Sequence, residues 1–214
     1  MSLVRFRNPC SLACYGASQT GKTSFVKKLL MNRDEMFEHK IHKILYCYTT
    51  YQKAFEEMEK IDNLEFKKGM PGPQDIEKLT ESGLHTILVL DDLMSVINNS
   101  NFAEEIFVCS SHHLCMTTIF LSQNLFQGGK KARTISLQLH YLVLFKNPRD
   151  RLQISNLARQ LYPGKTKNFQ AVYDDALAQP YSYLLIDISP HSNSLYQIRT
   201  LIFPQEDTIV YRLL

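Results

Sequence analysis

The 214-residue chain has 24 Lys and Arg against 21 Asp and Glu, a formal net charge of +3, and 44% hydrophobic residues. This length suits one sizeable α/β domain and is short for two, so we expect a single domain over residues 1–214. No apolar run approaches the length of a membrane span. The net charge is too small to attract nucleic acid by itself, so any contact with nucleic acid must come from local clusters of basic residues.

The first predicted element is a short apolar strand at residues 11–15, followed directly by a loop that matches G-x-x-x-x-G-K-[ST]. Residues 24–31 have apolar side chains at helical spacing, which completes the strand, loop and helix that a phosphate-binding loop requires. The backbone N–H groups of such a loop converge on a phosphate, and the helix N-terminus adds its dipole. The sequence therefore predicts a nucleotide site formed by Gly16, Ala17, Ser18, Gln19, Thr20, Gly21, Lys22, Thr23 and Ser24.

ATP and Mg²⁺ are the cofactors that this loop predicts. Lys22 is expected to reach the β- and γ-phosphate oxygens, and the hydroxyl of Thr23 to ligate Mg²⁺.

Residues 32–82 predict a second strand between short helices. A charged turn at 32–35 leads to a strand in the second half of 41–48, and a helix is expected from about 51 to 61. The clearest break in the chain lies at 69–73, with a short helix at 74–82 after it. We interpret the break as a loop within one domain, because too little sequence precedes it for a separate domain.

Five apolar or β-branched residues at 86–90 run directly into two carboxylates. This pattern is typical of a central parallel strand with acids at its carboxyl end, where α/β sheets bind ligands. Asp91 fits the acid that holds Mg²⁺ through water, and Asp92 the carboxylate that orients and polarises the attacking water. The alternative is that the two acids only cap the next helix.

The remaining elements continue the alternation of strand and helix. They are a helix around 102–114, strands at 117–124 and 141–145, helices at 151–161 and 166–177, and strands at 182–187 and 197–203. This order predicts a mainly parallel sheet covered by helices on both faces. We expect a core over about 10–188 and a short C-terminal strand extension over 189–214.

Polar and basic residues near the later strand ends are further candidates. Gln123 could sense the γ-phosphate or position water, or only solvate a loop. Arg133, Arg149 and Arg151 are candidates for the arginine that stabilises phosphoryl transfer from a neighbouring subunit, although any one of them is also an ordinary surface arginine. In the basic loop at 128–133, Lys130 and Lys131 are candidates for electrostatic contacts to DNA phosphates.

The five cysteines show no C-x-x-C pattern, and three lie in or beside predicted buried strands, as expected of reduced intracellular thiols. No secretory signal is visible, so we do not expect secretion. A compact cluster of Cys109, His112, His113 and Cys115 has no second half-site at usable spacing, which makes zinc binding the weaker interpretation.

Several blocks of the chain resemble the FtsK-HerA superfamily of P-loop ATPases. The likeness is closer to the genome-packaging ATPases of Polinton/Maverick elements, adintoviruses and related poxvirus-type viruses. The similar stretches, between about residues 10 and 188, are GASQTGKTSF, YCYTTYQKAFEEM, TILVLDDLM, SHHLCMTTIFLSQNLFQGGKKARTISLQLHYLVLFKNPRDRLQISNLARQLYP and PYSYLLID. The fold implied is the P-loop NTPase fold of the ASCE, RecA-like type.

The resemblance implies a motor that forms a homo-oligomeric ring, a pentamer or hexamer, at a capsid or portal vertex. It would use ATP to drive double-stranded DNA into a preformed capsid, within the host at the nucleus or viral assembly site, or associated with the virion, and with no membrane partner. The catalytic residues it implies are Lys22, Asp92, Gln123 and, as the arginine acting in trans, Arg133 first and Arg149 second. Many superfamily members carry Glu in place of Asp92, although the nearer viral relatives often share Asp.

Tyr48 and Gln52 also resemble a recurring pattern of this lineage, and either a place near the nucleotide or plain packing explains them. Three other functions stay open. They are a non-packaging DNA translocase or helicase, a small-molecule P-loop kinase, and a non-catalytic nucleotide-binding subunit.

Overall fold

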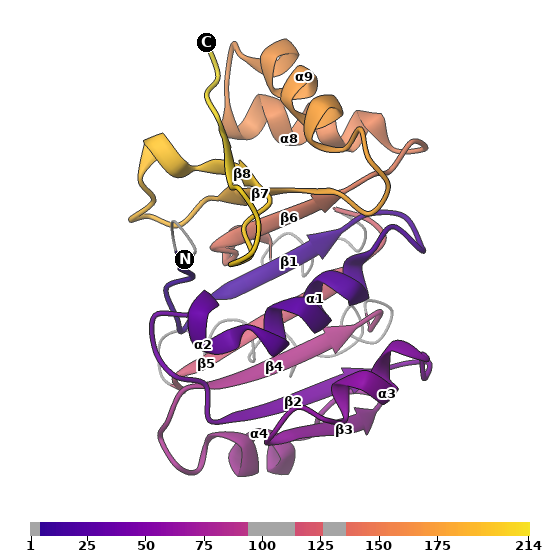
Figure 1. The fold of residues 1–214 in the computed structure, drawn as a ribbon, viewed down its shortest axis with the longest axis vertical. Coiled ribbons are helices and arrows are strands. Elements are labelled where there is room, and N and C mark those ends of the chain that lie inside the picture. The colour runs from indigo at the N-terminus through magenta and orange to yellow at the C-terminus, as the bar shows by residue number, and fades with distance from the viewer. Residues whose placement is uncertain (1–4, 94–113, 126–135) are drawn as a thin grey trace.

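The computed structural model describes residues 5–93, 114–125 and 136–214. These residues form one nine-stranded sheet in the order β3-β2-β4-β5-β1-β6-β7-β8-β9 (Figure 1). The strands are β1 (Ser11–Tyr15), β2 (Lys43–Tyr48), β3 (Leu64–Lys68), β4 (Thr86–Asp91), β5 (Met116–Ser122), β6 (Tyr141–Phe145), β7 (Tyr183–Asp187), β8 (Ile198–Thr200) and β9 (Ile209–Tyr211). The helices are α1 (Lys22–Met31), α2 (Arg33–Met36), α3 (Ala54–Met58), α4 (Pro73–Thr80), α8 (Arg151–Leu161), α9 (Thr166–Ala176) and the 3-10 turn η1 (Ser194–Tyr196).

The strands from β3 to β6 run parallel, with β1 between β5 and β6. Every residue of β1, β4, β5 and β6 is buried, as their apolar runs predict for strands covered on both faces. Their carboxyl ends therefore share one edge of the sheet, and the loop after β1 opens onto that edge.

From β7 onward the sheet is antiparallel. β7 runs against β6, β8 against β7, and β9 against β8. Tyr183, the first residue of β7, pairs with Phe145, the last residue of β6. The chain therefore enters β7 at the edge where the parallel strands end, which the order of the sequence elements does not reveal.

Two hydrophobic cores lie on opposite faces of the sheet. α1, α2 and α3 bury their apolar side chains in one core, and α4, α8 and α9 bury theirs in the other. Figure 1 shows α1 crossing in front of the central strands and the α8–α9 pair at one end of the molecule. The expectation of a mainly parallel sheet with helices on both faces is confirmed.

Local expectations differ from the structure at several places. Residues 33–35 of the expected charged turn at 32–35 belong to the short helix α2, with Asn32 as its N-cap, and the helix expected at 51–61 is only α3, five residues long. β3 and β9 were not predicted. The predicted helix around 102–114 and the basic loop at 128–133 lie outside the described residues, apart from Leu114.

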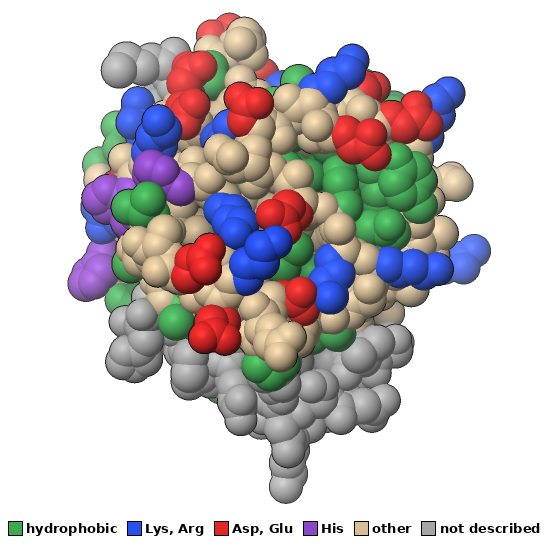
Figure 2. Space-filling model, turned by 90° about the horizontal axis from the view of Figure 1, so that it is seen from below, with side chains coloured by type: hydrophobic (Ala, Val, Ile, Leu, Met, Phe, Trp, Pro, Cys, Tyr) green, Lys and Arg blue, Asp and Glu red, His purple; other side chains and the backbone are tan. Residues whose placement is uncertain are grey.

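The edge strand β3 is charged and pairs with α4 through side chains. Lys67 Nζ lies 3.1 Å from Asp75 Oδ1, and Lys78 Nζ lies 3.2 Å from Glu65 Oε2. Figure 2 views this end of the molecule and shows basic and acidic side chains interspersed over it, with histidines gathered at one side and a hydrophobic patch at the other. In the described ranges, no helix combines the length and apolar character needed to cross a bilayer.

Candidate nucleotide-binding site

The loop between β1 and α1 has the backbone that its glycines predict. Gly21 has a φ of 104° and Gln19 a φ of 62°, both in the left-handed region. A Cβ on Gly16 would lie 2.5 Å from Phe145 Cβ, so the loop passes too close to β6 for any side chain there. Gly16 N donates to Ser122 O at 3.3 Å, which anchors the loop to the end of β5. The two glycines are therefore required by geometry as well as by the motif.

Lys22 is the central cation of the site. Its Nζ donates to Gly16 O at 2.6 Å and Ala17 O at 2.8 Å, and Thr20 Oγ1 donates to Ala17 O at 2.8 Å. Burial lowers the pKa of Lys22, and nearby negative groups, Asp91 and Asp92 among them, act against this shift. The ammonium group is thus held inside the curve of the loop, where the motif expects phosphate oxygens.

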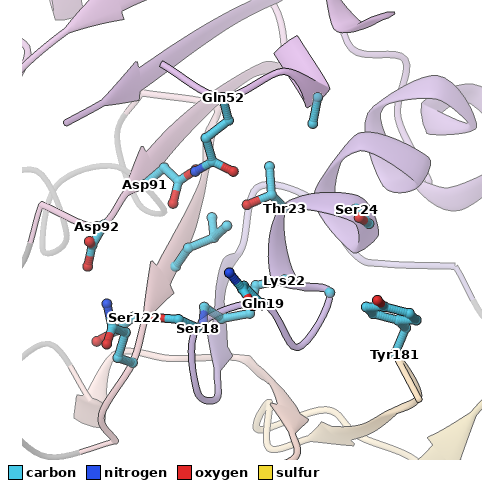
Figure 3. Close-up of a pocket in the computed structure, with 14 residues that line it drawn as sticks. Ser18, Gln19, Lys22, Thr23, Ser24, Gln52, Asp91, Asp92, Ser122 and Tyr181 are labelled. Carbon is cyan, nitrogen blue, oxygen red and sulfur yellow. The ribbon is translucent and has the colours of Figure 1, made fainter. Parts of the chain in front are cut away.

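A cavity of about 520 Å³ adjoins this loop. It is lined by the loop and the start of α1, by the segment between β2 and α3, by the ends of β4 and β5, and by the turn before β7. The lining residues are Ser18, Gln19, Gly21, Lys22, Thr23, Ser24, Gln52, Ala54, Asp91, Asp92, Leu121, Ser122, Gln123 and Tyr181. The structure thus brings the predicted phosphate loop, both carboxylates and Gln123 to one cavity (Figure 3).

Asp91 ends β4 and is only 5% exposed. Its Oδ2 accepts hydrogen bonds from Tyr46 Oη at 2.8 Å and from Gln52 Nε2 at 3.4 Å. Burial raises the pKa of Asp91 and neighbouring Asp92 raises it further, while the Tyr46 bond and Lys22 lower it. The carboxylate is therefore held in one orientation by the adjacent strand and the segment that follows it.

Asp92 is exposed and has a φ of 56°. Its N–H donates to Leu121 O at 3.3 Å, and its carbonyl accepts from Thr49 Oγ1 at 3.0 Å. Aspartate tolerates the left-handed region better than most residues do. The positive φ of Asp92 turns the backbone between the two acids, so that both line the cavity but Asp91 is buried against β2 and Asp92 is exposed.

The oxygen ligands fit a Mg²⁺ ion. Hydroxyl and carboxylate oxygens are its usual protein ligands, and Thr23 and Asp91 both line the cavity. In the described part of the chain, Tyr46 and Gln52 both donate to Asp91 Oδ2, which leaves Oδ1 available as a ligand atom. Figure 3 shows Thr23 and Asp91 on the same side of Lys22.

The remaining candidates fall into three groups. Gln123 lines the cavity, and its carbonyl accepts from Asn147 Nδ2 at 3.4 Å. Arg149 is exposed and does not line the cavity of its own chain, and Arg151 is paired with Asp174 on α9. The other basic candidates, Lys130, Lys131 and Arg133, lie outside the described residues.

The buried thiols behave as small apolar side chains. Cys10, Cys14 and Cys47 are free and buried, and burial raises the pKa of Cys10 and of Cys47 to about 12. No group of three or more metal-ligating side chains occurs among the described residues, which leave out Cys109, His112 and His113.

Sequence reasoning missed two residues that border the site. Tyr46 lies inside an apolar strand and has the pattern of a core residue, although its hydroxyl binds Asp91. Tyr181 lies in a turn whose place depends on the direction of β7. Gln52 was placed near the nucleotide as one of two interpretations, and the structure puts it in the cavity lining.

No protein-family profile matches the chain, and no curated protein matches its sequence. Solved structures are similar in fold. The DNA-packaging ATPase B204 from Sulfolobus turreted icosahedral virus has a TM-score of 0.56 at 10% identity, over 84% of this chain and 92% of that one. The genome packaging NTPase B204 from Sulfolobus turreted icosahedral virus 2, in complex with ATP-gammaS, has a TM-score of 0.54 at 12% identity, over 89% and 95% of the two chains.

EssC (ATPases 2 and 3) from Geobacillus thermodenitrificans has a TM-score of 0.58 at 11% identity, over 92% of this chain and 40% of that one. At these identities the likeness establishes the fold alone. The fold is that of the P-loop ATPases, in agreement with the loop, sheet and cavity described above.

Proposed function

We propose that this chain is an ATP-driven motor of the FtsK-HerA type that packages double-stranded viral DNA into a preformed capsid. The observation that carries the ATPase part is the convergence of Lys22, Thr23, Asp91, Asp92 and Gln123 on one cavity. A phosphate loop alone would serve binding, whereas an exposed second carboxylate beside it suits the activation of water.

The DNA-packaging part of the proposal is supported by structural similarity to two viral proteins over most of their length. Two viral proteins whose names describe DNA or genome packaging match over more than nine-tenths of their own lengths. The sequence blocks that resemble Polinton/Maverick, adintovirus and poxvirus-type packaging ATPases support the same conclusion and favour that lineage. In this proposal the protein acts inside the host, at the nucleus or viral assembly site.

Each residue of the cavity has a chemical role in hydrolysis. Lys22 exchanges the carbonyls of its own loop for phosphate oxygens, and the loop N–H groups bind the same anion. Asp92 orients the attacking water and accepts its proton, and the amide of Gln123 can donate to the γ-phosphate or bind that water. Thr23 and Asp91 would hold Mg²⁺, which supplies charge neutralisation at the phosphates when bound.

A neighbouring copy completes this site in the proposed ring. In the described ranges, no arginine lines the cavity, and Lys22 is its only basic residue. An arginine from an adjacent subunit would stabilise the charge that spreads over the transferred phosphoryl group. Arg133 and then Arg149 are the candidates, with a capsid or portal vertex as the partner on which a pentameric or hexameric ring assembles.

The test is steady-state ATP hydrolysis with and without double-stranded DNA. Lys22→Ala and Asp92→Asn are expected to lower kcat about 10²–10³-fold, because each removes a group that acts on the transition state. Lys27→Ala, on the same helix but paired with Glu57, and Asp62→Asn, an exposed acid, are the matched controls and should retain activity.

The outcomes separate the alternatives. Stimulation by DNA supports a DNA motor, and stimulation by empty capsids with protection of the DNA from nuclease supports packaging. Hydrolysis that DNA does not affect favours an ATPase that does not act on DNA. Hydrolysis only with a small phosphoryl acceptor, or none in any assembly state, overturns the motor proposal in favour of a kinase or a binding subunit.

A further inference from the structure

The turn between α9 and β7 has an unusual residue at its third position. Ser182 N donates to Gln179 O at 3.4 Å, which closes a four-residue turn with Pro180 second and Tyr181 third. Tyr181 has a φ of 62°. Proline at the second position and a positive φ at the third are the features of a type II turn, in which the third residue is normally Gly or Asn. A tyrosine in this position is strained.

Local packing does not account for the choice of tyrosine. Tyr181 is 72% exposed. In the part of the chain that the structure describes, its hydroxyl makes no hydrogen bond and its ring stacks on no other aromatic ring. A strained, exposed aromatic side chain without a hydrogen bond or a stacked ring among the described residues points to a role in function.

The turn is seated directly on the phosphate loop. A Cβ added at Gly21 would lie 3.4 Å from Tyr181 Cβ and 3.5 Å from Tyr181 Cδ1, so Tyr181 borders the position that a side chain at Gly21 would take. Because β7 runs antiparallel to β6, its first residue lies beside Phe145 at the carboxyl edge of the parallel strands. The reversal of direction at β7 is therefore what brings Tyr181 to the nucleotide cavity.

Tyr181 and the two carboxylates occupy opposite ends of this cavity. Figure 3 shows Asp91 and Asp92 on one side of Lys22, and Tyr181 on the other, beside the start of α1. A nucleotide whose terminal phosphate faces the carboxylates and whose phosphate chain follows the loop has its base at the Tyr181 end. An exposed ring at that end is suited to stacking on a base.

We propose that Tyr181 is the platform on which the base of the bound nucleotide stacks. This inference rests on the proposed nucleotide site and identifies what sets its selectivity. Stacking depends on the size of the π-surface and not on the hydrogen-bonding edge of the base. The site therefore binds ATP and GTP with affinities within a few-fold of each other, and binds both more tightly than CTP or UTP.

The experiment compares two ligands that share a phosphate chain and differ in the base. Dissociation constants for ATP-gammaS and for inorganic tripolyphosphate, each with Mg²⁺, are measured by calorimetry on the full chain and on Tyr181→Ala, Tyr181→Phe and Tyr181→Trp. The loss of one base stack is expected to weaken ATP-gammaS binding to Tyr181→Ala by about tenfold or more. Tripolyphosphate binding should not change, and Phe and Trp should retain ATP-gammaS affinity.

Leu201→Ala is the matched control, since Leu201 is also partly exposed with a positive φ of 53°, and does not line the cavity. It should bind both ligands as the unchanged chain does. Equal loss of ATP-gammaS and tripolyphosphate affinity in Tyr181→Ala overturns the inference, because the turn would then only support the loop. Unchanged ATP-gammaS affinity in Tyr181→Ala, or CTP binding as tight as ATP, overturns it as well. If the unchanged chain binds neither ligand, the proposed function fails first.

Discussion

The parallel and antiparallel parts of the sheet contribute differently to the cavity. The parallel strands β1, β4 and β5 end in the phosphate loop, Asp91 and the approach to Gln123, and β2 holds Asp91 through the buried Tyr46. The antiparallel part contributes Tyr181 alone, on an exposed turn. Lys22 and Asp91 are thus held by hydrogen bonds to their neighbours, and Asp92 and Gln123 are exposed but follow buried strand ends. The group proposed for base binding lies instead on an exposed turn.

Catalysis and base stacking have different structural requirements. Chemistry needs charges held within a fraction of an ångström, which burial and hydrogen bonds provide at the cost of shifted pKa values. Stacking needs an accessible flat surface and tolerates movement. Substitutions in the parallel part should therefore have large effects on rate and fold, and substitutions in the antiparallel turn should have small effects on both.

The largest expected effect is that of Asp91→Asn, which should lower kcat about 10²–10³-fold through loss of the charge that holds Mg²⁺. The same change should raise the Tm of the nucleotide-free protein at pH 7. Burial raises the pKa of Asp91, so the folded state binds its proton more tightly than the unfolded state does, and stability falls as the pH rises through that range. Asparagine cannot ionise and still offers Tyr46 an acceptor.

The measurement is thermal unfolding of both proteins between about pH 4 and 7, with the exposed Asp62→Asn as control. The gain in Tm for Asp91→Asn should grow toward pH 7. A Tm that stays equal to, or drops below, that of the unchanged chain would show that the ionised carboxylate is well stabilised in the fold.

Gly16→Ala tests the close packing of the parallel part. The new Cβ would lie 2.5 Å from Phe145 Cβ and 3.2 Å from its carbonyl carbon, so β1 and β6 must move apart. We expect a loss of about 1–3 kcal/mol of unfolding free energy, together with weaker nucleotide binding. Urea unfolding and calorimetry measure the two effects.

Gly164→Ala is the control, because Gly164 has a φ of 80° and nothing within 4 Å of its missing side chain. It should lose about 1 kcal/mol from backbone strain and bind nucleotide unchanged. Nucleotide binding that survives in Gly16→Ala would mean that the loop adapts more readily than this packing implies.

Tyr46→Phe tests the support of Asp91 from β2. The hydrogen bond from Tyr46 lowers the pKa of Asp91, so its loss should raise that pKa and move the acidic limb of the kcat/KM pH profile toward higher pH. We expect about a threefold to tenfold lower kcat at neutral pH, which corresponds to about 1 kcal/mol. A shift in the profile would not follow from a packing defect alone.

Tyr141→Phe is the matched control, since Tyr141 is equally buried and its hydroxyl accepts from Arg7 N at 3.2 Å, away from the cavity lining. Its pH profile should match that of the unchanged chain. Identical pH profiles in Tyr46→Phe and Tyr141→Phe would show that Tyr46 does not affect the pKa of Asp91 during catalysis.

The smallest expected effect is in the antiparallel turn. Tyr181→Gly should raise the unfolding free energy by about 0.5 kcal/mol, because relief of the positive-φ strain exceeds the entropy that glycine adds to the unfolded chain. Urea unfolding of Tyr181→Gly and of Leu201→Gly should give gains of the same sign. A clear destabilisation of Tyr181→Gly would show that the ring packs against the fold, in contrast to the free platform proposed for it.

The sequence predicts the parallel part of the fold well, because central parallel strands are buried on both faces and have continuous apolar runs. β3 was missed since three of its five residues are charged, and an edge strand needs only its backbone to pair. Lys22, Asp91 and Asp92 belong to local motifs that can be recognised without a structure. Tyr46 could not be assigned from its pattern, because a hydroxyl inside an apolar strand gives no sign of its partner.

The position of Tyr181 at the cavity depends on how strands far apart in the sequence pair with each other. Nothing within the segment around it fixes whether β7 runs with or against β6, and in the parallel direction the same turn would lie at the opposite edge of the sheet. The arginine in trans is likewise not a property of one chain. The residues of this site that the sequence does not predict are therefore those placed by the direction of β7 or contributed by a neighbouring subunit.

The two outer strands of the sheet leave backbone groups that could recruit a further strand from another chain. β3 carries Glu65, Lys67 and Lys68, and β9 is only three residues long. Charged side chains and short length are the features by which natural sheets resist edge-to-edge aggregation. Copies of this chain are thus discouraged from joining into one continuous sheet, and the subunits of the proposed ring would meet through side chains and not through paired strands.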